Sequence, residues 1–192
     1  MSKIETNKID SISGTSTLKI GETNATTLDF DTGITSVTNI PQPITNAPAF
    51  FVKKTSNQTL SDNAVVKLTF ESVDVDTDSG FDNTTNHRYT IPTGKAGKYL
   101  FFYHVQASSG TASQARQLEL RLRKNGSNIL HTRDRPYIND ATAITMSASI
   151  IHDCSAGDYF ELFAQMDVGS GNVSVESYTG ATNFGAYRLI GV

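Results

Sequence analysis

The sequence predicts an all-β fold, a jelly-roll β-sandwich, on three observations. Short segments that alternate apolar and polar residues recur from residue 49 to residue 190, with turn-forming residues between them. No segment has the spacing of an amphipathic helix. One stretch, residues 97–105, is apolar on both faces, as a strand in the middle of a packed structure requires. Together they indicate a sandwich of about eight to ten strands.

The stretch 97–105 gives the first indication of function. Read with a period of two, its first face carries Tyr99, Phe101 and Tyr103, and its second face carries Leu100 and Phe102. One face can fill the core, while the second needs a cover. Because no helix is apparent that could supply this cover, we expect the domain to self-associate.

Composition narrows the class of protein further. The chain has 192 residues, of which 38% are hydrophobic, and no apolar run approaches the roughly 18–20 residues of a transmembrane helix. We therefore expect no membrane insertion, and the first residues lack the apolar core of a signal peptide. The net charge of −3 gives no general attraction to nucleic acid, and a single cysteine, Cys154, allows no intrachain disulfide.

Residues 1–46 differ from the rest of the chain. They are rich in Thr, Ser and Asn, and a short alternating pattern at 17–21 recurs at 27–31. Their apolar residues are too sparse for a core in one copy, so they form either a thin β-stalk with other copies or a flexible polar arm. Three prolines within 40–48 predict a stiff linker. We therefore divide the chain into an N-terminal arm or stalk, 1–46, and a jelly-roll domain, 47–192.

The second part is expected to consist of short strands in succession. We expect residues 71–88 to form a polar loop, and Asn125-Gly126 is the strongest hairpin signal in the sequence. The expected strands are 49–52, 64–70, 89–92, 98–106, 117–123, 127–130, 144–150, 159–164, 173–175 and 184–190.

Several motifs in this part resemble the globular heads of the complement one-q and tumour necrosis factor superfamily. They are Ala49-Phe50, the Gly-Lys-Tyr-x-Phe-x-Tyr-His strand from Gly97, Arg123-Lys124-Asn125-Gly126, Ala156-Gly157-Asp158-Tyr159 and the closing segment 182–190. The resemblance covers roughly residues 48–192. It implies a ten-stranded jelly roll that assembles as a homotrimer. The residues expected at the contacts between copies are Tyr99, Leu100, Phe101, Phe102, Tyr103, Tyr159, Phe163 and Tyr187.

Residues 7–21 are similar to segments of tail-fibre and other virion proteins of marine tailed bacteriophages. No collagen-type Gly-x-y stalk precedes the domain, which departs from the animal complement proteins. The resemblance implies a bacteriophage virion protein that is made in the bacterial host cytoplasm. It would bind other virion proteins through residues 1–46.

Two clusters could bind ions or anionic ligands. Asp74, Asp76 and Asp78 alternate as calcium ligands can, but the segment does not fit the helix–loop–helix calcium template, and a solvated turn is the simpler interpretation. A basic set could bind an anionic surface ligand such as lipopolysaccharide phosphate, or could form a charged outer face with salt bridges, which we favour. This set consists of Arg116, Arg121, Arg123, Lys124, Arg133 and Arg135.

No catalytic constellation is apparent. His152 and Cys154 would share a face of a strand, but no residue that could orient the pair is visible. The remaining histidines lack metal-ligand spacing, and we expect no metal and no cofactor. We therefore interpret the protein as a non-enzyme.

The leading hypothesis is a trimeric virion appendage whose domain recognises or adheres to the bacterial surface, through a glycan. The loops expected to make contacts are 71–88, 106–115 and 131–142. The first alternative is a capsid decoration or cement protein with no receptor role. The second is a hydrolase of host polysaccharide, although a chain of this length leaves little room for a catalytic groove.

Overall fold

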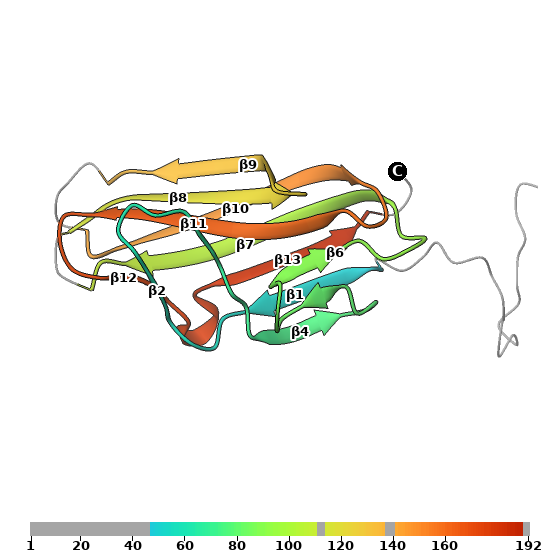
Figure 1. The fold of residues 1–192 in the computed structure, drawn as a ribbon, viewed down its shortest axis with the longest axis horizontal. Coiled ribbons are helices and arrows are strands. Elements are labelled where there is room, and N and C mark those ends of the chain that lie inside the picture. Colours follow the sequence, from blue (N-terminus) through green and yellow to red (C-terminus); the bar gives the residue numbers. More distant parts are fainter. Residues whose placement is uncertain (1–46, 111–113, 137–140, 190–192) are drawn as a thin grey trace, which may run out of the picture. The chain divides into compact units, whose positions relative to one another are not determined.

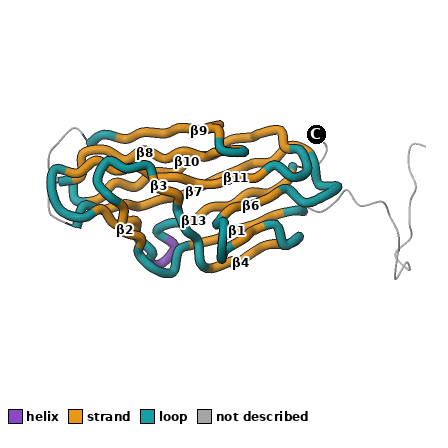
Figure 2. The backbone as a smooth tube through the Cα atoms, in the orientation of Figure 1, coloured by secondary structure: helices purple, strands orange, loops and turns teal. Residues whose placement is uncertain are grey.

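A computed structural model of the chain describes residues 47–110, 114–136 and 141–189. Across these residues two antiparallel sheets form a β-sandwich, which confirms the predicted all-β jelly-roll class (Figure 1). A short 3₁₀ helix, Tyr178–Gly180, interrupts the strands (Figure 2). No helix of this part of the chain is long and apolar enough to span a membrane. The expected N-terminal arm or stalk, 1–46, lies outside the described residues.

The first sheet has seven strands, and β7 lies at its centre. On one side of β7 lies β10 (Ala143–Cys154), which pairs with it along its whole length. Apart from β10, neighbouring strands of the sheet follow the order β2 (Gln58–Leu60), β12 (Val173–Val175), β7 (Gly97–Ser108), β13 (Asn183–Arg188), β1 (Ala49–Lys53) and β4 (Ser72–Asp76).

The second sheet has six strands, and β11 lies at its centre. The short strand β3 (Val66–Lys67) pairs with β11 outside the main order. The other strands follow in the order β5 (Phe81–Asp82), β6 (Arg88–Thr90), β11 (Tyr159–Val168), β8 (Ala115–Lys124) and β9 (Ser127–Asp134).

The core fills the space between the two sheets, because β7, β10 and β11 alternate more buried and more accessible residues. In β8 the leucines at 118, 120 and 122 are fully buried. Aromatic rings stack from one sheet to the other: the ring centroids of Phe50 and Tyr89 are 4.1 Å apart, and those of Phe101 and Phe160 are 4.2 Å apart. These offset contacts stabilise the packing of the sheets beyond the burial of their area.

The β8–β9 hairpin turns at Asn125-Gly126 as the sequence predicts. Both residues have positive φ, 50° and 83°, as a two-residue hairpin turn of the primed type requires. Asparagine and glycine tolerate this conformation better than other residues. The turn therefore fixes the register in which Lys124 lies opposite Ser127, and an irregularity between Leu122 and Arg123 then shifts the pairing so that Leu122 lies opposite Leu130.

Two expectations about the first half of the domain are wrong. Residues 71–88 are not a continuous loop, because β4 and β5 lie within them. β4 pairs through its backbone with β1 at the edge of the sheet, with an irregularity between Phe51 and Val52, so its side chains do not alternate cleanly. The expected strand 64–70 is reduced to β3, although Leu68 and Phe70 are buried.

Candidate interaction surfaces

The outer face of the seven-stranded sheet carries a continuous apolar area. Leu100 lies on β7 between Tyr187 of β13 and Ile151 of β10, and its neighbour on the same face is Phe102. Ile151 lies on β10, which pairs only with β7 at the edge of the sheet, and it is 58% exposed, one of the largest exposures of an apolar side chain among the described residues. We call this area the apolar face, and its residues are Phe51, Val75, Leu100, Phe102, Ile151 and Tyr187.

Gly185 is what allows the apolar face to be continuous. It lies between Phe51 and Phe102, whose rings stack with centroids 6.2 Å apart. A Cβ at this position would lie 2.5 Å from Cζ of Phe102 and 2.9 Å from the carbonyl oxygen of Phe50. A larger residue would push the ring of Phe102 away from Phe51, so glycine is required here.

Charged and polar side chains surround the apolar face. Lys53 pairs with Asp74 at 2.7 Å between Nζ and Oδ2, and Lys98 pairs with Asp153 at 2.6 Å between Nζ and Oδ1. Further along β7, Nδ1 of His104 lies 2.7 Å from Oγ of Ser147, beside a shallow hollow. An apolar centre with a polar border is the usual anatomy of a protein–protein interface.

The predicted contact residues separate into three groups. Tyr99, Phe101 and Tyr103 are at most 2% exposed and belong to the core of the single chain. They have no surface to offer to another copy, so their prediction as contacts is corrected. Leu100, Phe102 and Tyr187 lie on the apolar face. The remaining two, Tyr159 and Phe163, lie on β11 of the other sheet, away from this face.

The outer face of the six-stranded sheet is basic and centres on one buried carboxylate. Glu119 is 3% exposed, and its oxygens lie 2.6 Å from Nη2 of Arg121, 2.6 Å from Nη2 of Arg133 and 2.9 Å from Nε2 of His131. Burial opposes ionisation of Glu119, but the hydrogen bonds from Arg121 and His131 and the charge of Arg133 outweigh it. The pKa of the carboxyl is therefore lowered.

Two further cations of this face lie over aromatic rings. The guanidinium carbon of Arg123 is 4.0 Å from the centroid of Phe163, and that of Arg88 is 4.4 Å from the centroid of Tyr159. Tyr159 and Phe163 therefore serve as platforms for arginine side chains. Lys67 of the neighbouring strand β3 pairs with Glu161 at 3.1 Å between Nζ and Oε1.

The predicted basic set is brought together only in part. Arg121, Arg123 and Arg133 lie on this outer face, and the exposed Arg135 donates from Nε to Oε1 of Gln117, which in turn donates to Glu119. In contrast, Lys124 pairs with Asp158 at the β10–β11 turn and is not part of the set. We call the group Arg88, Arg121, Arg123, Arg133, Arg135 and Lys67 the basic face.

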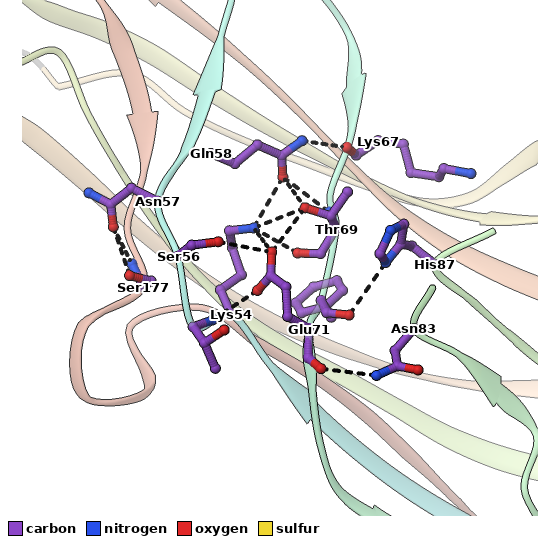
Figure 3. A network of polar contacts seen from close by, with 12 residues as sticks. Lys54, Ser56, Asn57, Gln58, Lys67, Thr69, Glu71, Asn83, His87 and Ser177 are labelled. Atoms are coloured by element: carbon purple, nitrogen blue, oxygen red, sulfur yellow. Dashed lines mark hydrogen bonds and ion pairs between the residues drawn. The ribbon is translucent and has the colours of Figure 1, made fainter. Parts of the chain in front are cut away.

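A second polar network, inside the molecule, was not apparent in the sequence. Lys54 directly follows β1, and its side chain has no exposed area. Its Nζ donates to the carbonyl oxygen of Thr69 at 2.7 Å and lies 3.3 Å from both Oε1 of Glu71 and Oε1 of Gln58 (Figure 3). Burial lowers the pKa of Lys54 below its usual value, and Glu71 opposes that shift only in part.

The carboxylates of Asp74, Asp76 and Asp78 do not point toward a common site. Asp74 pairs with Lys53, Asp78 pairs with Lys95, and Asp76 accepts hydrogen bonds from the backbone amides of Gly80 and Phe81. Among the described residues no group of three or more His, Cys, Asp or Glu side chains could hold a metal ion. These carboxylates therefore act as turn and ion-pair residues of this edge.

His152 and Cys154 lie at the end of β10 as expected, but their environment disfavours thiol chemistry. Cys154 is 6% exposed, and burial raises the pKa of its thiol to about 12. Sγ of Cys154 lies 3.5 Å from the backbone carbonyl oxygen of His152. The thiolate that a nucleophile needs is therefore scarcely populated at neutral pH.

Of the comparisons with known proteins, only the one with solved structures finds similar proteins. No protein-family model matches the chain, and no curated protein has a significantly similar sequence. Among solved structures, the globular domain of zebrafish complement 1qA is similar with a TM-score of 0.50 and 17% identity, over 74% of this chain and 97% of that one. Two crystal structures of murine APRIL are similar with TM-scores of 0.52 and 0.53, each at 10% identity over 73% of this chain and 98% of that one.

The likeness shows that the described domain has the jelly-roll fold of the complement one-q and tumour necrosis factor domains. At these identities it shows the fold alone. The interaction surfaces described above are therefore argued from this chain's own residues.

Proposed function

We propose that the protein is a trimeric, non-enzymatic binding module of a bacteriophage virion, made in the cytoplasm of a bacterial host and used for attachment to the bacterial surface. The observation that carries the self-associating part is the apolar face. Ile151 and Val75 are 58% and 44% exposed at its two sides, with Leu100 and Phe102 between them. Burying such an area against another copy contributes roughly 25 cal/mol per Å² of apolar surface.

A second copy of this chain is the cover that we propose for the apolar face. Among residues 47–110, 114–136 and 141–189 the only helix is the 3₁₀ helix Tyr178–Gly180, which borders Phe51 and has only three residues, too few to cover this face. The ion pairs at its border, Lys53–Asp74 and Lys98–Asp153, would exclude alternative registers through like-charge contacts. The number three comes from the resemblance to the complement one-q and tumour necrosis factor superfamily.

The direct test of the self-associating part is to place a charge on the apolar face. We expect Ile151→Lys to convert the protein to a monomer in sedimentation velocity, because an unpaired ammonium would have to be buried. Val65→Lys is the matched control, since Val65 is also exposed, at 39%, but precedes β3 at the six-stranded sheet. If both variants keep the mass of the wild type, the apolar face is not the contact.

The virion part of the proposal rests on the similarity of residues 7–21 to phage fibre segments. Deletion of residues 1–46 should leave a folded domain that no longer enters virus particles. Particles that still carry the truncated protein would contradict an anchoring role of this segment. A copy number that follows the capsid lattice would instead favour a capsid decoration protein.

We propose binding rather than catalysis as the role of the domain. The burial of Cys154 and the internal pairing of Asp74, Asp76 and Asp78 leave these candidate groups engaged in structure. Incubation of the protein with purified host glycan should release no reducing ends. Release of oligosaccharides that scales with protein concentration would support the hydrolase alternative.

A further inference from the structure

We infer that the basic face binds an acidic polysaccharide, one that carries carboxylate, phosphate or sulfate groups. This inference rests on the proposed attachment function and names the chemical class of its ligand. It also assigns the ligand to the outer face of the six-stranded sheet rather than to the loops at the ends of the sandwich.

The first argument is the segregation of charge within the domain. The whole chain has a net charge of −3, yet the basic face brings six cationic side chains onto one sheet. The acidic residues on the same face are Glu119, Glu161, Asp167 and Asp82, the last of which lies opposite Arg88, so the cations outnumber the carboxylates there. A surface that is locally positive on a negatively charged protein attracts an anionic polymer to one side and repels it from the rest.

The second argument is that the cations are held in place before any ligand binds. Glu119 is 3% exposed and contacts both Arg121 and Arg133, so one negative charge faces two guanidinium groups that stay protonated. Arg133 keeps 51% of its side chain exposed. The buried carboxylate therefore orients the arginines without neutralising them, and less rotamer entropy is lost when they bind.

The third argument concerns the kind of polyanion. Proteins that bind single-stranded nucleic acid stack bases on open aromatic faces. Here the ring of Phe163 is covered by Arg123 and the ring of Tyr159 by Arg88, so the rings are occupied by the protein's own cations. The surface instead offers guanidinium donors spread over β6, β8 and β9, which suits a chain of separate anionic groups such as an acidic glycan.

The test uses the full-length protein and immobilised dextran sulfate, polygalacturonate, neutral dextran and single-stranded DNA. We expect binding to the two acidic polysaccharides that weakens as salt is added, and none to neutral dextran. Arg133→Gln combined with Arg135→Gln should weaken this binding about tenfold or more, because two charge-assisted contacts are removed. The matched control combines Lys53→Gln with Lys98→Gln, two exposed and ion-paired cations at the border of the apolar face.

The outcomes separate this inference from the proposed function. If the arginine variant binds as tightly as the wild type, or if the lysine control loses as much, the basic face is not the site and the inference is overturned. Tighter binding to DNA than to the acidic polysaccharides would overturn it too. The mass in solution and the adhesion to host cells are measured on the same variants. A protein that still assembles and adheres while ignoring acidic polysaccharides would retain its proposed function and lose only this ligand.

Discussion

Tyr89 and Tyr99 are both fully buried tyrosines, but only one has a partner for its hydroxyl group. The hydroxyl of Tyr99 donates to the carbonyl oxygen of Lys95 at 2.6 Å. The hydroxyl of Tyr89 has no hydrogen-bond partner among the described residues, although its ring stacks on Phe50. Burying a hydroxyl group without a hydrogen-bond partner lowers the free energy of unfolding, whereas burying a phenyl ring without that hydroxyl carries no such cost.

The two tyrosines should therefore respond differently to loss of the hydroxyl. Tyr89→Phe should leave the free energy of unfolding unchanged or raise it by about 1 kcal/mol. Tyr99→Phe should lower it by about 1 kcal/mol, because the carbonyl oxygen of Lys95 loses its donor. Urea unfolding of both variants checks this pair, and an equal loss in both would show that the hydroxyl of Tyr89 is also satisfied.

At the scale of elements, the segment that joins β1 to β2 is held by a charge that is hidden from solvent. Lys54 has no exposed side-chain area, whereas its neighbour Lys53 has 38%. Lys54 is satisfied by Thr69, Glu71 and Gln58, which come from the next segments of the chain (Figure 3). The network therefore ties the β1–β2 connection to the segment that leads from β3 to β4.

Replacement of the adjacent residues Lys53 and Lys54 should change the free energy of unfolding by very different amounts. Lys54→Met should lower the free energy of unfolding by about 3 kcal/mol, because it leaves the carbonyl oxygen of Thr69 without its lysine donor and the carboxylate of Glu71 without its cation. Lys53→Met removes only an exposed ion pair with Asp74 and should change the free energy of unfolding far less. Thermal unfolding compares the two variants, and a similar loss in both would mean that the network of Lys54 is not structural.

The β10–β11 turn has an acid-sensitive contact at Asp158. Burial raises the pKa of this carboxyl, but Lys124, the amide of Ser155 and Asn125 lower it further, to about 2. A depressed pKa contributes stability that is present above the unfolded value of about 3.9 and is lost as the pH falls toward about 2. The contribution of Asp158 to the stability of this turn is therefore lost as the pH falls from about 4 to about 2.

Asp158→Asn isolates this contribution. At pH 7 the variant should be less stable by about 1–3 kcal/mol, because the charge-assisted hydrogen bonds to Lys124 and Ser155 are weakened. The difference should shrink between about pH 4 and pH 2, since protonation removes the same charge from the wild type. Urea midpoints at pH 7, 4 and 2 measure it, and a difference that stays constant with pH would rule out the ionised carboxylate as its source.

At the scale of the whole molecule, the alternation of residues was enough to predict the sandwich. In the structure one face of β7 is buried and the other is more accessible, and the leucines of β8 all lie on the buried side, as a period of two requires. The edge strands β4 and β5 were missed, because a strand that pairs through its backbone at an edge needs little alternation.

The surfaces were harder to predict than the fold. Lys53 and Lys54 look alike in the sequence, and only the packing of Thr69 and Glu71 distinguishes them. Tyr159 and Phe163 were grouped with Leu100, because composition does not reveal to which sheet an aromatic strand belongs. Phe51 and Ile151 carried a signal that went unused: each follows a like residue, Phe50 or Ile150, so one member of each pair must face outward.

The central claim is that the apolar face is covered by further copies of the same chain. The mass of the purified full-length protein in solution, measured by light scattering, tests it most directly. We expect a mass near three times 20.8 kDa. A mass near 20.8 kDa would contradict the claim and mean that the chain itself covers Leu100, Phe102 and Ile151.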